Sequence, residues 1–346
     1  MLRVILATSR LDIRDSILKA IATDKQIEIV ATAFNGAEAV EKTKELRPDL
    51  VLLGVSLQTL DSLEATKEIM IEAPTPIVLV FSVPDPRAVE LSVRALEAGA
   101  LAVTPAPPQK SGSADGTAVR KFLSTLRAMS QVKVVRRWRD RPNLKTGSKR
   151  LPTGNKSSPR IVGIAASTGG PAAVQSILAK LPGDFPAPIL IVQHIASGFI
   201  EGVASWLDAA IALKVKVAED GELLAPHVVY LAPDGHHLGV ASRSRIVVAD
   251  DPPINGFRPS GTYLFASMAR VFGSEAVGII LTGMGNDGAD GLRAVYEVDG
   301  TVLAQDETSS VVFGMPKAAI DAGIAHRVLP LDEIARTMIS LVMNGC

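Results

Sequence analysis

Arg160-Ile-Val-Gly-Ile-Ala-Ala-Ser-Thr-Gly-Gly-Pro171 is the stretch of sequence that decides the fold. The apolar run Ile161–Ala165 predicts a strand buried on both faces, as in a parallel sheet. Ser167–Pro171 predicts a tight glycine turn, and Ala172–Lys180 predicts a helix with Pro171 near its start. A strand, a turn and a helix in this order are typical of an α/β domain.

The rest of the second half repeats this alternation. Further strands are predicted at Pro188–Gln193, Leu213–Val217, Val277–Thr282, Thr301–Ala304 and Ala325–Leu329. Between Val228 and Ala249 the spacing shortens, with turns at 234–235 and 242–244, which predicts an antiparallel hairpin set on the parallel sheet. We therefore expect a Rossmann-like, mostly parallel sheet domain with an antiparallel hairpin.

The first half predicts five strand–helix units. The strands are expected at Arg3–Ala7, Glu28–Ala31, Leu50–Val55, Pro76–Ser82 and Leu101–Thr104. The helices are expected at Ile13–Ala22, Ala37–Leu46, Leu63–Ile71, Ala88–Ala98 and Ala118–Met129. This pattern predicts a doubly wound, flavodoxin-like domain.

A basic segment separates the two halves. Residues 132–160 hold ten of the 36 Lys and Arg residues and one of the 36 Asp and Glu residues, and proline and glycine interrupt them. The remainder therefore carries 26 basic and 35 acidic residues, a net charge of −9. We predict domains at 1–131 and 160–346 joined by an exposed linker at 132–159, and the linker either is solvated or binds an acidic surface.

Composition narrows the function classes. The 346 residues carry no net charge, which argues against wrapping nucleic acid, and aromatic residues at 4% leave little for base stacking. The single cysteine, Cys346, excludes an intrachain disulfide and a Cys-rich zinc site. No apolar stretch approaches the ~20 residues of a membrane span, and no export signal is seen, so we expect a cytoplasmic protein without membrane insertion.

Three predicted strands end in residues that suit acyl-transfer chemistry. Ser167 follows the first strand and His194 follows the next. Asp287 follows the predicted strand Val277–Thr282, in the stretch Leu281-Thr-Gly-Met-Gly-Asn-Asp-Gly288. Strand ends of a parallel sheet share one crevice, so these residues could act as nucleophile, general base and orienter. Gly169 and Gly170 would let a substrate approach the backbone, and the helix N-terminus would stabilise an oxyanion.

Each residue also has a plain structural interpretation. The Ser-Thr-Gly-Gly turn is also typical of a helix cap or a phosphate site, and an Asp in Gly-Asn-Asp-Gly is often a turn residue. The nucleotide interpretation lacks a G-x-G-x-x-G or Walker pattern. His236 and His237 are adjacent, so on a strand they face opposite sides and make a poor metal pair.

The ordered set of these motifs resembles the chemotaxis response-regulator protein-glutamate methylesterases over nearly the whole chain. The resemblance rests on Gly163–Pro171, Val192–Ile195, Tyr230–Pro233 with His237-Leu238, Arg258–Ser260, Leu281–Gly288, Ala304–Asp306, Gly314–Ala319 and Val328–Leu331. It implies that Ser167 attacks a receptor glutamate methyl ester, that His194 takes the serine proton and that Asp287 holds His194. It further implies that Thr168 and the Met284 N–H support the reacting site. Glutamine deamidation by the same route is also implied, with no cofactor and no metal.

The first half resembles that family's receiver domain but departs from its chemistry. In the family, two acidic residues hold Mg²⁺, a central Asp accepts phosphate and a Lys pairs with it. Here Ala7 and Thr8 stand at the acidic positions, Gly54 at the phosphoacceptor and Ala106 at the lysine, and of the switch residues Ser82 alone remains. Asp61 lies past the strand and is a poor substitute.

We therefore expect a pseudo-receiver that is not phosphorylated on aspartate. It could cover the catalytic crevice, or dock on a receptor or a chemotaxis kinase complex. The expected function is a serine methylesterase acting on methyl-accepting chemoreceptors. The alternative is a non-catalytic signalling adaptor that retains the methylesterase fold.

Overall fold

The computed structural model describes residues 1–55, 57, 61–82, 86–108, 115–132 and 160–343. Contacts between Cα atoms divide the chain into two compact units, Met1–Arg141 and Pro142–Cys346. The predicted linker at 132–159 lies, apart from Val132, outside the described residues. The two halves of the chain therefore fold as separate α/β units, each with a parallel sheet of its own.

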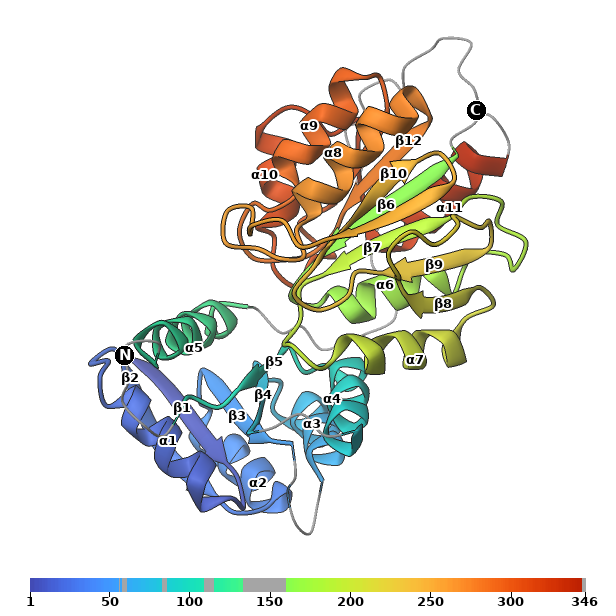
Figure 1. The fold of residues 1–346 in the computed structure, drawn as a ribbon. Coiled ribbons are helices and arrows are strands. Elements are labelled where there is room, and N and C mark those ends of the chain that lie inside the picture. Colours follow the sequence, from blue (N-terminus) through green and yellow to red (C-terminus); the bar gives the residue numbers. More distant parts are fainter. Residues whose placement is uncertain (56, 58–60, 83–85, 109–114, 133–159, 344–346) are drawn as a thin grey trace. The chain divides into compact units, whose positions relative to one another are not determined.

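The first unit alternates strands and helices throughout (Figure 1). Its elements are β1 (Leu2–Ala7), α1 (Leu11–Ile21), β2 (Ile27–Ala33), α2 (Gly36–Leu46), β3 (Leu50–Gly54), α3 (Ser62–Glu72), β4 (Ile77–Phe81), α4 (Pro86–Ala98), β5 (Ala102–Pro105) and α5 (Asp115–Ser130). The strand order is β2-β1-β3-β4-β5, and all pairs are parallel. This is the doubly wound, flavodoxin-like arrangement that the sequence predicts.

Burial and capping explain these elements. Every residue of β3 and β4 is buried, as their continuous apolar runs predict, whereas β2 lies at the edge and is half-buried. Helices α2 and α3 begin after side chains that accept backbone N–H bonds, Asn35 from Glu38 and Asp61 from Glu64, both at 2.9 Å. Helices α2, α3 and α4 pack side by side, while α5 contacts α1.

The second unit contains a larger parallel sheet. Its elements are β6 (Ile161–Ala166), α6 (Gly170–Leu178), β7 (Ile189–Gln193), α7 (Ile200–Ala210), β8 (Lys214–Val217), β9 (Val228–Leu231), β10 (His237–Ser242), β11 (Arg245–Ala249), α8 (Gly261–Phe272), the 3-10 helix η1 (Gly273–Glu275), β12 (Ala276–Ile280), α9 (Ala289–Glu297), β13 (Thr301–Gln305), α10 (Met315–Asp321), β14 (Arg327–Leu329) and α11 (Leu331–Met343). The strand order is β14-β13-β12-β6-β7-β9-β8.

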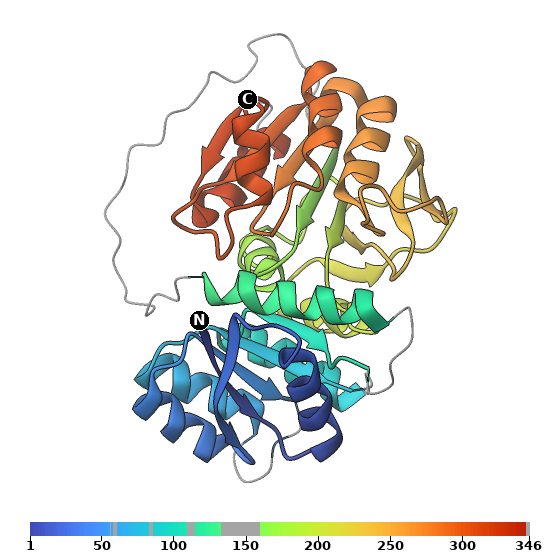
Figure 2. The ribbon, with the colours of Figure 1, turned by 90° about the vertical axis from the view of Figure 1, so that its left-hand side faces the viewer.

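The predicted antiparallel hairpin forms, but as a separate two-stranded sheet of β10 and β11. Strand β9, at the start of the region assigned to the hairpin, instead joins the main sheet in parallel to β7 and β8. Strand β10 packs on α8, and Figure 2 shows the hairpin beside this helix. The seven-stranded sheet is therefore wholly parallel, with the hairpin as an addition on its α8 side.

The topology positions the catalytic candidates. The chain adds strands on one side of β6 first, with β7 as its neighbour, and later returns to the other side with β12. A crevice opens at such a switch point, beyond the carboxyl ends of the strands. No helix in the described ranges is long and apolar enough to cross a bilayer.

Candidate active site

Ser167 lies one residue beyond the carboxyl end of β6, at the start of a turn that is tied to the loop after β12. Its N–H donates to the carbonyl of Thr282 at 3.0 Å, and the Thr282 hydroxyl donates to the carbonyl of Thr168 at 2.8 Å. Gly169 has a φ of +75°, and a Cβ there would lie 2.6 Å from Val311. The turn therefore needs glycine both for its conformation and for its close packing.

A second glycine makes room for the serine itself. A Cβ on Gly283 would lie 2.7 Å from the Cβ of Ser167 and 2.3 Å from the sulfur of Met315. Gly283 follows Thr282 in the loop after β12, and its N–H donates to the carbonyl of Val312 at 2.9 Å. The loop after β12 thus forms the floor beneath Ser167.

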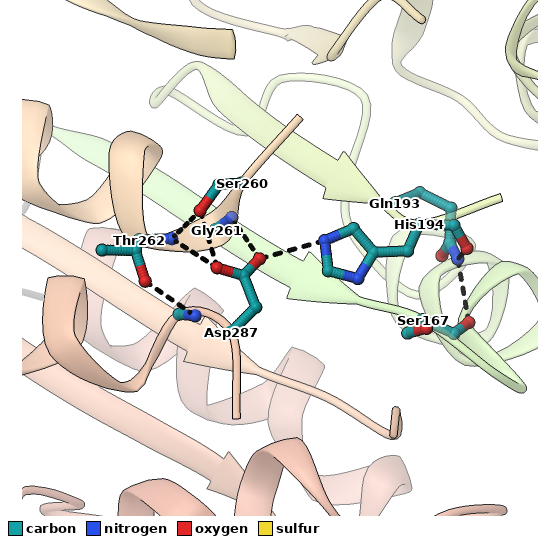
Figure 3. Close-up of polar contacts among 8 residues, drawn as sticks. Ser167, Gln193, His194, Ser260, Gly261, Thr262 and Asp287 are labelled. Carbon is teal, nitrogen blue, oxygen red and sulfur yellow. Dashed lines mark hydrogen bonds and ion pairs between the residues drawn. The ribbon is translucent and has the colours of Figure 1, made fainter. Parts of the chain in front are cut away.

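His194 lies beside this turn because β7 pairs with β6. Ala166 is in register with Gln193, and the His194 N–H donates to the Ala166 carbonyl at 2.9 Å. Ser167 and His194 therefore follow the last paired residues of two adjacent strands. Figure 3 shows the imidazole ring between Ser167 and Asp287.

Asp287 contacts the imidazole from the opposite side. Its Oδ2 lies 3.0 Å from Nε2 of His194, and the carboxylate side chain is fully buried whereas the His194 side chain is 13% exposed. Neither ring nitrogen of His194 makes a hydrogen bond of good geometry, so the 3.0 Å approach of Nε2 to Asp287 is a close polar contact. Nδ1 remains unpartnered, which leaves it available to a hydroxyl; such contacts often tighten only when substrate binds.

The start of α8 fixes the carboxylate of Asp287 (Figure 3). Ser260 donates its hydroxyl to Oδ1 at 2.6 Å, and the Gly261 N–H donates to Oδ2 at 2.7 Å. Burial alone would raise the pKa of Asp287, but the contacts with His194, Ser260 and Gly261 outweigh it and hold the pKa below its ordinary value. The carboxylate is therefore ionised at neutral pH and suited to stabilise an imidazolium.

Backbone donors are free next to Ser167. Within the described part of the chain, the N–H groups of Thr168 and Met284 make no intrachain hydrogen bond. Met284 lies in the loop after β12 and is 45% exposed. Unpaired N–H groups beside a nucleophile can bind a developing oxyanion. The structure thus brings together the predicted Ser167, His194, Asp287, Thr168, Gly169, Gly170 and Met284 at one edge of the sheet.

Two further residues contact the proposed triad: Phe257, for which the sequence gives no signal, and Ser260, which belongs to the motif Arg258–Ser260. The Phe257 ring stacks on His194 with the centroids 4.6 Å apart and the planes 13° from parallel. Its Cζ lies 3.9 Å from the position of a Cβ on Gly285, so the ring spans from the imidazole to the loop that carries Met284. Periodicity gives no signal for such a contact, because Phe257 lies outside every regular element.

We expect Phe257→Leu to lower kcat for hydrolysis of an activated ester, p-nitrophenyl acetate, about tenfold, because a stacked aromatic pair contributes about 1 kcal/mol and here restrains the imidazole. Steady-state kinetics of the variant and the wild type measure this change in kcat. Tyr296→Leu is the matched control, since Tyr296 contacts His326 with ring centroids 4.9 Å apart, outside this site. Equal rates for wild type and Phe257→Leu would contradict a restraining role.

The positions at which the first unit differs from the receiver family lie close together in the structure. Ala7 ends β1, Thr8 follows it, Gly54 ends β3 and Ala106 follows β5, so all four lie at the carboxyl edge of the sheet. A Cβ on Gly54 would lie 2.9 Å from the hydroxyl oxygen of Thr8, whose side chain is buried. Asp61 is engaged as the cap of α3.

The histidines and carboxylates of the described residues form no metal-binding group. Among the described residues, no three or more His, Cys, Asp or Glu side chains are placed to hold a metal ion. His237 is buried and stacks on Tyr263 with centroids 4.7 Å apart, whereas His236 is exposed.

Comparisons with known proteins match both units. Residues 162–338 match the CheB methylesterase family, and residues 6–105 match the response regulator receiver domain. The chain is 51% identical over 341 residues to the protein-glutamate methylesterase/protein-glutamine glutaminase of group 3 operon of Rhizobium meliloti (strain 1021), covering 99% of this chain and 96% of that protein. It is 45% identical to protein-glutamate methylesterase/protein-glutamine glutaminase 4 of Myxococcus xanthus (strain DK1622), covering 98% and 96%. The crystal structure of the Thermotoga maritima CheB methylesterase catalytic domain matches with a TM-score of 0.53 and 42% identity, over 54% of this chain and 100% of that one.

Proposed function

The chain belongs to the CheB methylesterase family, and from that membership we propose that it hydrolyses glutamate methyl esters of methyl-accepting chemoreceptors through Ser167, His194 and Asp287. The observation that carries this assignment of roles is the 3.0 Å contact between Nε2 of His194 and the buried Oδ2 of Asp287, beside the Ser167 turn. A serine needs such a base to act as a nucleophile at neutral pH.

The reaction follows the order of acyl transfer. Ser167 Oγ attacks the ester carbonyl carbon while Nδ1 of His194 takes the hydroxyl proton, and Asp287 stabilises the imidazolium. The N–H groups of Met284 and Thr168 bind the oxyanion of the tetrahedral intermediate. Collapse breaks the bond to the methoxy group, which leaves as methanol with the proton from His194 and gives an acyl-enzyme on Ser167.

Water completes the cycle. His194 takes a proton from water, the hydroxide attacks the acyl carbon, and the bond to Ser167 Oγ breaks as the serine regains its proton from His194. The product is a free receptor carboxylate. A receptor glutamine would follow the same route with ammonia as the leaving group, consistent with the double name of the curated relatives.

The test is release of labelled methanol from receptor membranes that carry radioactive methyl esters. The proposed function expects release that depends on the protein and on time. The adaptor alternative expects binding to the same membranes with all label retained. Membranes that keep their label in the presence of folded protein would overturn the methylesterase proposal.

We further propose that the first unit does not accept phosphate from acyl-phosphate donors. Gly54 offers no side-chain oxygen, and Ala7 and Thr8 offer no carboxylates for the Mg²⁺ that such transfer needs. The buried Thr8 side chain also takes the space into which a residue at position 54 would extend. This unit would then serve by docking, on a receptor or on the chemotaxis kinase complex, or by covering the catalytic crevice.

We expect neither wild-type protein nor Gly54→Asp to gain a phosphoryl group on incubation with acetyl phosphate and Mg²⁺. An aspartate at 54 alone would meet Thr8 and lack its metal ligands. Intact-mass spectrometry measures the adduct, and a receiver domain that retains its acidic residues serves as the positive control. A phosphoryl adduct within residues 1–131 of the wild type contradicts the proposal.

A further inference from the structure

The amide of Gln193 joins the nucleophile turn to the residue that carries the base. Gln193 is the last residue of β7 and is 3% exposed. Its Nε2 donates to the carbonyl oxygen of Ser167 at 2.8 Å and to that of His194 at 2.9 Å. Figure 3 shows the first of these bonds, which crosses from β7 to the turn after β6. One side chain thus binds the backbone of both proposed reacting residues.

Gly170 leaves the space that this amide occupies. A Cβ on Gly170 would lie 2.2 Å from Oε1 of Gln193 and 2.8 Å from its Nε2. Gly170 is the first residue of α6, and its N–H donates to the Ser167 carbonyl at 2.8 Å. The glycine and the glutamine therefore depend on each other, because any larger residue at 170 would displace the amide.

The amide orientation follows from its neighbours. Both protons of Nε2 point at carbonyl oxygens, whereas Oε1 is buried and has no hydrogen-bond partner. The reverse orientation would place Oε1 against two carbonyl oxygens, which repel it. The two accepting carbonyl oxygens therefore set which way the Gln193 amide faces.

We propose that Gln193 is a positioning residue that fixes the separation of Ser167 and His194; this rests on the catalytic roles proposed above. The last backbone bond between β6 and β7 is that from the His194 N–H to the Ala166 carbonyl. Beyond it, the link between the Ser167 and His194 backbones is the Gln193 amide. Because acyl transfer is sensitive to small displacements of nucleophile and base, the loss of this link should slow the chemical step more than substrate binding.

Two substitutions of similar shape test the proposal in the full-length chain. Gln193→Met removes both donors, and Gln193→Glu replaces the donor nitrogen with an oxygen. We expect kcat for p-nitrophenyl acetate to fall about 100-fold in each, with KM unchanged, and the rate of labelling by a fluorophosphonate probe to fall in parallel. The labelled fraction at completion normalises kcat to functional sites. Gln175→Met, on α6 and half-buried, is the control.

A double-mutant cycle distinguishes a specific interaction between residues 170 and 193 from a general loss of folded protein. Gly170→Ala should displace the Gln193 amide and lower kcat. In a Gln193→Ala background the clash with the amide is gone, and the 2.9 Å approach of the added methyl to the Cβ of Ala166 remains. We therefore expect Gly170→Ala to lower kcat by a smaller factor in the Gln193→Ala background than in the wild type. Additive losses, or a wild-type kcat per labelled site in Gln193→Met, would overturn the positioning role.

The outcomes separate this inference from the proposed function. Wild-type protein that reacts with the probe but releases no methanol from methylated membranes overturns the methylesterase proposal, and the probe rates then decide the role of Gln193. Wild-type protein inert to probe, p-nitrophenyl acetate and membranes overturns both. A rise in KM with unchanged kcat would place Gln193 in substrate binding and also contradict the inference.

Discussion

Ser167→Ala is expected to lower methanol release from methylated receptor membranes by roughly 10⁴- to 10⁶-fold, because no acyl-enzyme can form without the hydroxyl. Folding should be unaffected. Within the described part of the chain the Ser167 hydroxyl makes no hydrogen bond, and the backbone of the turn is held instead through Thr282 and Gln193. The thermal midpoint of unfolding should therefore equal that of the wild type.

A second serine provides the control. Ser205 is exposed on α7, and its hydroxyl donates to the carbonyl of Glu201 at 2.9 Å. Ser205→Ala removes the same atom at a distant position and should retain full activity. Covalent labelling by a fluorophosphonate should be lost in Ser167→Ala and retained in Ser205→Ala. Wild-type methanol release by Ser167→Ala would show that another group is the nucleophile.

Much of the site could be predicted because it depends on strand ends. Continuous apolar runs mark buried parallel strands, and the residues that follow them must gather at one sheet edge. That rule places Ser167 and His194, each one residue beyond its strand, at the same edge, and it places the loop after β12, which carries Asp287, there as well. It leaves open which strands are neighbours, and the structure answers with β7 and β12 on the two sides of β6.

The contacts that orient these residues could not be predicted in the same way. Phe257 reaches His194 across 63 residues of chain, and the Ser260 hydroxyl reaches Asp287 across 27. Gln193 belongs to the motif Val192–Ile195, but its role depends on the direction that its side chain takes at the very end of β7. Periodicity assigns a face to a residue inside an element; it carries no information on side-chain direction in the loops beyond.

The hairpin shows the same limit. Short runs and turns between Val228 and Ala249 correctly indicate antiparallel pairing, yet the local pattern does not say which sheet each strand joins. Strand β9 continues the parallel sheet, and β10 with β11 packs on α8 instead. Long-range packing decides which sheet each strand joins. The hairpin affects the site only indirectly, because the segment Asp250–Pro259 connects it to Ser260.

Asp287→Asn is expected to lower kcat by roughly 10⁴-fold while retaining the fold. When the asparagine oxygen takes the Oδ1 position it still accepts from Ser260, but its NH₂ group then takes the Oδ2 position and faces Nε2 of His194. The imidazole would have to accept there and carry its proton on Nδ1, towards Ser167, where a base is needed. Asp290→Asn, exposed in the first turn of α9, is the matched control and should retain full activity.

The same substitution has a pH signature in stability. The pKa of Asp287 is lower in the folded state than its ordinary value, so its ionised form stabilises the fold above about pH 3.9, and this contribution is lost as pH falls through the folded pKa. Asp287→Asn lacks this contribution. The difference in free energy of unfolding between wild type and variant, from urea titrations, should be largest near neutral pH and shrink below about pH 3.9. A difference that stays constant across this range would mean that the carboxylate is not held in its charged form by His194, Ser260 and Gly261.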